Sequence, residues 1–188
     1  ATMVELQRLT YSNLALALQN PVNDTVNSAD NYIAATYEFF PEEGKYHYDG
    51  VANKQFRCSP QQRKELALSN PTLAKQLTVG VLSRIEELAD RPINYIAPKR
   101  PKYYSLIPLQ EIIADCVHVN KSSIKVQKLY WQLLEKASEF DYLTQFNRSQ
   151  LIKMAGNVIA NSIIAMRDGK VIVTPGFDGI YGRVKIDV

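Results

Sequence analysis

The sequence contains two histidines and two cysteines, the residue types that bind zinc or act as nucleophiles. A structural zinc site needs four nitrogen or sulfur ligands, usually in two close pairs, whereas only His47 and Cys58 occur in the first hundred residues. Cys116 lies in an apolar segment, which is typical of a core position, and His118 follows at its end, where an imidazolium suits a helix C-terminus. These residues therefore predict neither a zinc site nor a cysteine nucleophile.

Other catalytic patterns are also missing. Glu42-Glu43 and Glu86-Glu87 are adjacent in sequence, and neighbouring residues on a helix diverge by about 100 degrees, so neither pair converges on one atom. The chain has no Gly-x-x-x-x-Gly-Lys phosphate loop. The sequence thus contains no recognisable active site.

A glycine turn gives a clearer signal for nucleic acid. Residues 151–164 (LIKMAGNVIANSII) are similar to the second half of a helix-hairpin-helix element, with Gly156 and Ala160 at its spacing and Met154 in place of its earlier glycine. In that motif, N–H groups at the turn bind a DNA phosphate. We expect the DNA contacts to come from Arg148, Lys153, Ala155, Gly156 and Asn157. The alternative is one uninterrupted helix, in which Gly156→Ala would stabilise the fold by up to ~1 kcal/mol.

A second candidate contact combines basic and aromatic side chains. Lys99, Arg100 and Lys102 precede Tyr103 and Tyr104, so the cations can contact a nucleic-acid backbone while the rings stack on bases. The alternative interpretation is a solvated linker, because prolines 92, 98, 101 and 108 surround this run.

The charge distribution permits a polyanionic partner. The net charge is +3: residues 1–58 hold four basic and seven acidic side chains (net −3), and residues 59–188 hold 18 basic and 12 acidic ones (net +6). No apolar stretch approaches the ~18 to 20 residues of a spanning helix, and no export signal is visible. With two distant cysteines, the sequence predicts a reducing, cytoplasmic location and no membrane partner.

The hydrophobic pattern predicts an α+β fold, with a small mixed module followed by a mainly helical domain that ends in a β-hairpin. The expected helices are 6–20, 60–68, 82–89, 109–118, 123–138 and 149–167. The expected extended segments are 32–40, 46–50 and 77–81, with the hairpin at 170–174 and 180–187. The proline-rich stretch 92–105 predicts a boundary.

Three longer segments carry a family resemblance. They are 37–50 (YEFFPEEGKYHYDG), 77–81 (LTVGV) running into 84–92 (RIEELADRP), and 169–182 (GKVIVTPGFDGIYG). Together they resemble the C-terminal half of the endonuclease-Q-like PHP-domain proteins, a family often labelled helicase-like. The resemblance extends from about Val4 to the end of the chain.

This resemblance implies a domain organisation. The family joins a catalytic PHP phosphoesterase domain to a small zinc module and a helical C-terminal region, and some members nick DNA at deaminated bases. By analogy, residues 1–35 are the last helix and tail of a PHP domain, 36–97 a degenerate zinc-module-like region, and 98–188 the helical domain. No PHP metal ligand has a match here, so the resemblance implies that this chain lacks the catalytic domain and has that domain as a partner.

The zinc module departs from the family pattern at every ligand. The expected ligand positions fall on Val51, Lys54, Asn70 and Leu73. We expect apolar packing to replace the metal, through Phe56, Leu66, Leu68, Leu73 and Leu77.

The sequence therefore predicts the DNA-binding region of a PHP-type DNA-repair endonuclease-like protein, without catalytic residues, metal or cofactor of its own. The principal alternative is a protein-interaction or dimerisation module with no nucleic-acid role. A stand-alone enzyme is a third possibility.

The missing ligands lead to a prediction about metal content. Because a valine, a lysine, an asparagine and a leucine occupy the family's four positions, the purified protein should contain no stoichiometric zinc. Elemental analysis after dialysis against a weak chelator measures this directly. About one tightly held zinc ion per chain would contradict the prediction.

Overall fold

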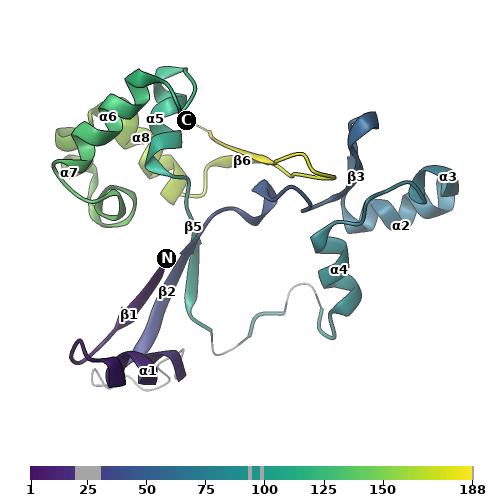
Figure 1. The fold of residues 1–188 in the computed structure, drawn as a ribbon, viewed down its shortest axis with the longest axis horizontal. Coiled ribbons are helices and arrows are strands. Elements are labelled where there is room, and N and C mark those ends of the chain that lie inside the picture. The colour runs from purple at the N-terminus through teal and green to yellow at the C-terminus, as the bar shows by residue number, and fades with distance from the viewer. Residues whose placement is uncertain (20–30, 93–94, 98–99, 188) are drawn as a thin grey trace. The chain divides into compact units, whose positions relative to one another are not determined.

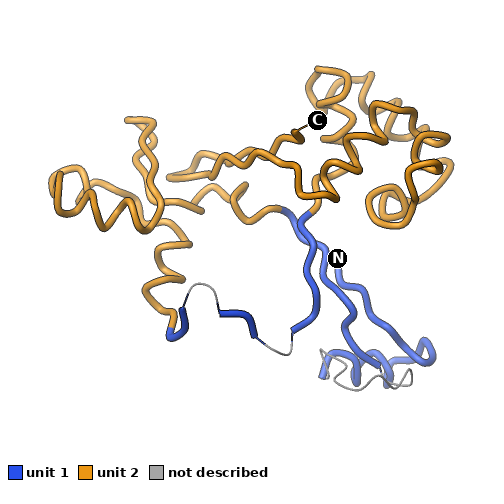
Figure 2. Tube along the Cα trace, turned by 180° about the vertical axis from the view of Figure 1, so that it is seen from behind, with its two compact units in different colours: residues 1–39, 90–105 blue, residues 40–89, 106–188 orange. Residues whose placement is uncertain are grey.

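The computed structural model describes residues 1–19, 31–92, 95–97 and 100–187. The chain forms two compact units that are each discontinuous in sequence: unit 1 contains residues 1–39 and 90–105, and unit 2 contains residues 40–89 and 106–188 (Figure 2). In the described ranges no helix is long and apolar enough to cross a membrane. The expected division into a PHP-domain tail (1–35), a zinc-module-like region (36–97) and a helical domain (98–188) stays a prediction.

Unit 1 is a three-stranded sheet with one helix. Strand β1 (Thr2–Glu5) pairs antiparallel with β2 (Tyr32–Glu38), and β5 (Lys102–Ser105) pairs with β2 in parallel, in the order β1-β2-β5. Helix α1 (Tyr11–Gln19) contacts β2. The buried Ala17 and Ala35 belong to α1 and β2.

Two expectations for unit 1 were wrong. The helix expected from residue 6 begins at Tyr11, because residues 2–5 extend to pair with β2. The second error is the solvated linker given as the alternative for the basic and aromatic run, since Lys102–Ser105 form β5. Tyr103 and Tyr104 favour a strand, and Pro101 lies just outside the ladder, where its missing N–H has no cost.

Residues 40–89 of unit 2 form a short β-hairpin, three α-helices and two single turns of 3-10 helix, labelled η. The elements are η1 (Pro41–Glu43), β3 (Asp49–Val51), η2 (Ala52–Lys54), β4 (Phe56–Cys58), α2 (Pro60–Ser69), α3 (Pro71–Ala74) and α4 (Val81–Leu88). Helix α2 begins as expected, with a capping box between Ser59 and Gln62 and a proline at its first position. The strand expected at 77–81 is only one bridge between Thr78 and Gly50.

Residues 106–188 form the helical domain and the terminal hairpin, so the predicted α+β fold is confirmed (Figure 1). The elements are α5 (Leu109–Val117), α6 (Ile124–Leu134), η3 (Asp141–Gln145), α7 (Arg148–Ala155), α8 (Asn157–Arg167), β6 (Val171–Thr174) and β7 (Arg183–Ile186). Leu109, Ile112, Leu151 and Ile163 are fully buried in their common core. Their burial is the main force that holds these helices together.

The expected helix 123–138 is wrong in its last four residues. Helix α6 ends at Leu134, and the chain then makes a π-helical turn, η3. The guanidinium of Arg167 donates to the carbonyls of Tyr142, Leu143 and Phe146 at 2.6, 2.8 and 2.7 Å. These bonds supply donors to backbone carbonyls in and just after η3. An arginine 21 to 25 residues away in sequence holds this turn, so no local pattern could predict it.

The loop of the terminal hairpin packs closely on residues 42–52. The N–H groups of Gly176 and Gly182 donate to the carbonyls of Glu42 and Glu43 at 2.8 and 3.1 Å. A Cβ at Gly182 would collide with the Glu42 carbonyl oxygen, so this approach requires glycine. Asp178 accepts from the Ala52 N–H and the Thr78 hydroxyl, both at 2.6 Å, which lowers the pKa of its carboxyl.

The expectation of one uninterrupted helix over residues 149–167 is also wrong, because the helix is interrupted at Gly156. This residue has φ +83° and ψ 164°, a conformation that is essentially restricted to glycine, and α7 and α8 pack against each other on its two sides. A Cβ at Gly156 would meet no atom within 4 Å, so backbone conformation and not space requires the glycine.

This conformation predicts the sign of a substitution. Gly156→Ala should lower the free energy of unfolding by about 1 to 3 kcal/mol, because alanine is strained at this φ and ψ. Chemical denaturation measures the change, with Ala155→Gly as a control for general helix propensity. A Gly156→Ala protein more stable than the wild type would show that the helix is continuous after all.

Candidate nucleic-acid interface

The turn at Gly156 leaves the first N–H groups of α8 without an acceptor in the described chain. The first intrahelical bond of α8 runs from the Ala160 N–H to the Gly156 carbonyl at 3.0 Å, and no side chain caps the helix. The N–H groups of Asn157, Val158 and Ile159 have no acceptor in the part of the chain that the structure describes. Together with the helix dipole they form a partial positive charge suited to an oxyanion.

Two lysines add positive charge beside these N–H groups. Lys153 is exposed in the last turn of α7, as the sequence predicted. Lys136 follows α6, and its ammonium donates to the Met154 carbonyl at 3.3 Å. One hydrogen bond leaves two further donors on the Lys136 ammonium. Sequence reasoning missed Lys136, since only tertiary packing brings it to the turn.

The other expected residues of this element occupy different places. Arg148 begins α7, about 10 Å along the helix axis from the turn, and donates to the Asn161 side chain of α8 at 3.1 Å. Asn157 is exposed at the start of α8, whereas Ala155 packs partly against the core. Lys153, Gly156 and Asn157 therefore lie together at the turn, and Arg148 does not.

The second predicted group lies in unit 1, and Lys99 is outside the described residues. The guanidinium of Arg100 lies over the ring of Tyr103, 5.3 Å from its centroid, and Lys102 begins β5 with its side chain exposed. Tyr104 stacks on Tyr37, with 5.3 Å between ring centroids. The rings of Tyr103 and Tyr104 are 56% and 45% exposed, so this edge strand presents two aromatic surfaces beside two cations.

The positions that hold zinc in the family do not fit a metal here. Val51 packs in a buried cluster with Cys58 and Leu77, the Lys54 ammonium donates to Gln76 at 2.6 Å, and the Asn70 side chain caps α3. Within the described ranges, no three histidine, cysteine, aspartate or glutamate residues cluster closely enough to bind a metal.

The apolar packing expected in this region is present only in part. Phe56, Leu66 and Leu77 belong to the cluster around Val51, whereas Leu68 is 87% exposed and the cluster does not include Leu73.

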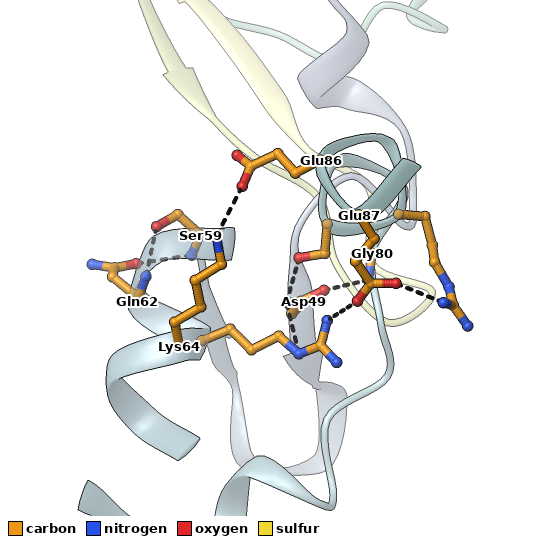
Figure 3. A network of polar contacts seen from close by, with 10 residues as sticks. Asp49, Ser59, Gln62, Lys64, Gly80, Glu86 and Glu87 are labelled. Atoms are coloured by element: carbon orange, nitrogen blue, oxygen red, sulfur yellow. Dashed lines mark hydrogen bonds and ion pairs between the residues drawn. The ribbon is translucent and has the colours of Figure 1, made fainter. Parts of the chain in front are cut away.

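A buried carboxylate network holds the same region (Figure 3). Asp49 is fully buried, and its side chain accepts from the Gly80 N–H and from the Ser83 hydroxyl at 2.7 Å. Backbone carbonyls satisfy the first N–H groups of α4, because Val81 and Leu82 donate to Tyr46 and His47 at 2.7 and 3.1 Å. Arg63 completes the network, 3.6 Å from Asp49 and 3.1 Å from Glu87. These pairs satisfy a buried charge that would otherwise be strongly destabilising.

No family model matches the chain, but individual proteins do. The chain is 34% identical over 156 residues to the uncharacterized protein MJ0043 of Methanocaldococcus jannaschii, a match that covers 82% of this chain and 20% of that protein. It is 28% identical over 181 residues to the uncharacterized protein YqxK of Bacillus subtilis, a match that covers 96% of this chain and 41% of that protein. The chain thus spans less than half the length of either relative.

Two solved structures share its fold. One is the lesion-specific endonuclease PfuEndoQ of Pyrococcus furiosus, at a TM-score of 0.79 and 27% identity over 98% of this chain and 44% of that one. The other is endonuclease Q in complex with a 27-mer duplex that has an abasic lesion at the active site, at a TM-score of 0.75 and 27% identity over 99% of this chain and 45% of that one. The expected resemblance is confirmed: the chain is similar, over nearly its whole length, to the C-terminal half of an endonuclease-Q-like protein.

Proposed function

We propose that this chain is the DNA-binding region of an endonuclease-Q-like repair protein, and that the turn between α7 and α8 binds a backbone phosphate. One observation carries the proposal: Gly156 leaves the N–H groups of Asn157, Val158 and Ile159 without an acceptor in the described chain, and the Lys136 ammonium reaches the turn at the Met154 carbonyl. N–H groups at a helix N-terminus with flanking cations bind phosphate without reading base sequence.

The resemblance to known structures supports DNA as the ligand. The endonuclease Q neighbour that covers 99% of this chain is a complex with duplex DNA. Incision, in this proposal, belongs to a catalytic PHP domain outside this chain, and the chain itself contributes no catalytic residue, metal or cofactor.

We also propose that the edge strand β5 contacts DNA independently. Arg100 and Lys102 supply positive charge, and the exposed rings of Tyr103 and Tyr104 supply stacking surfaces. This combination is typical of proteins that bind unpaired nucleic acid.

A protein-interaction role has one observation in its favour. Helix α1 and the segment just before it expose large apolar side chains, among them Leu9 at 90% and Leu18 at 60%. Such a surface suits an apolar protein partner, for which the protein's own PHP domain is our proposal. This role is compatible with DNA binding through unit 2.

The phosphate proposal predicts a specific salt dependence. Lys153→Gln and Lys136→Gln should each weaken binding to every duplex severalfold, and each should make the slope of log affinity against log salt shallower by roughly 0.9, because one phosphate contact is lost. Fluorescence anisotropy with duplexes of two unrelated sequences measures both quantities.

Lys185→Gln is the matched control, because Lys185 is an exposed lysine on β7 and its removal changes the net charge equally. It should leave the slope nearly unchanged. If all three variants lose affinity alike, the binding is diffuse attraction to a basic surface and the turn is not the site. If the wild type binds no DNA, the interaction-module alternative holds.

A further inference from the structure

The solvent face of α6 carries an unusual pair of features outside the turn. Trp131, the one tryptophan of the sequence, is 60% exposed, although tryptophan normally buries most of its ring. Lys125 and Lys128 lie within two turns before it, and neither has an ion-pair partner among the residues that the structure describes. This set of three residues is the α6 face.

A chain of contacts holds the exposed indole in place. The ring of Tyr130 meets that of Trp131 edge to face, with 5.7 Å between centroids. The Tyr130 hydroxyl donates to Glu139 at 2.7 Å, and burial together with this carboxylate raises the pKa of Tyr130 to about 12. Glu139 also accepts from the Leu109 N–H at 2.8 Å, at the start of α5. Trp131 therefore presents a flat apolar surface beside an anchored tyrosine ring.

The charge around this indole favours an anionic ligand. Helix α6 contains two lysines and no acidic residue, and Glu135 just beyond its end is the nearest acid in sequence. On a helix, Lys125 and Lys128 lie one turn apart and Lys128 and Trp131 lie one turn apart. From Lys125 to Trp131 the helix rises about 9 Å. Beyond the end of α6, Lys136 reaches the Met154 carbonyl at the turn.

We propose that the α6 face binds single-stranded DNA, with an unpaired base stacked on Trp131 and adjacent phosphates on Lys125 and Lys128. The inference rests on the proposed function and extends it to a second substrate form. Every base has an apolar face, so this contact should be indifferent to sequence. Base pairing in a duplex hides those faces, so the contact should discriminate single strands from duplexes.

Trp131 itself supplies the first measurement. Because it is the one tryptophan, its fluorescence reports on the α6 face alone. A single-stranded oligonucleotide should quench this emission strongly at saturation, since a stacked base is in van der Waals contact with the indole. A fully paired blunt duplex of the same length should quench it much less.

Affinity for the same two probes provides the second measurement. Trp131→Leu should weaken single-strand binding by roughly fivefold or more, while duplex binding changes little. Trp131→Phe should recover part of the loss, because it restores a ring. Tyr181→Leu is the matched control. Tyr181 lies in the loop of the terminal hairpin and is 68% exposed, and the Lys45 ammonium lies over its ring. Thermal melting checks that each variant is folded.

The outcomes separate this inference from the proposed function. If Trp131→Leu binds single strands as tightly as the wild type does while Lys153→Gln still weakens duplex binding, the α6 face is not a stacking site and the phosphate proposal stands. If Trp131→Leu weakens both probes equally, the inference is also overturned. If the wild type binds neither probe, both proposals fail together.

Discussion

The positive φ of Gly156 is the constraint on which the helical domain depends. It ends α7 and starts α8 in a new direction, so that Leu151 of one helix and Ile159 and Ile163 of the other enter the same core. The same break produces the uncapped start of α8. A side chain is excluded there by backbone conformation and not by crowding, which leaves the turn open to solvent. The fold and the candidate site therefore share one origin.

Long-range polar contacts complete the structure where local sequence does not specify it. Arg167 satisfies the carbonyls that end η3, Asp49 accepts from the Gly80 N–H just before α4, and Asp178 joins the terminal hairpin to Ala52 and Thr78. In the region that resembles a zinc module, Val51, Cys58 and Leu77 pack together. Apolar burial and hydrogen bonds thus hold this region together.

The parts of the fold that local pattern could predict were those with local causes. Helix α2 follows from its Ser59 cap and Pro60, α4 and α5 from apolar periodicity, and the terminal hairpin from alternation around residues 175–179. Strand β5 and the turn η3 were missed because their partners, β2 and Arg167, are distant in sequence. The glycine at the candidate site was visible from sequence, but Lys136 was not, because only packing places it beside Met154.

Amide NMR of the nitrogen-15-labelled protein, titrated with a short duplex, tests the central claim most directly. The account predicts that the N–H resonances of Asn157, Val158 and Ile159 move downfield along one saturable curve, because they gain a phosphate acceptor. The N–H of Ala160, already bonded to Gly156, should move far less. Saturable DNA binding with the resonances of Asn157 to Ile159 unmoved would contradict the account.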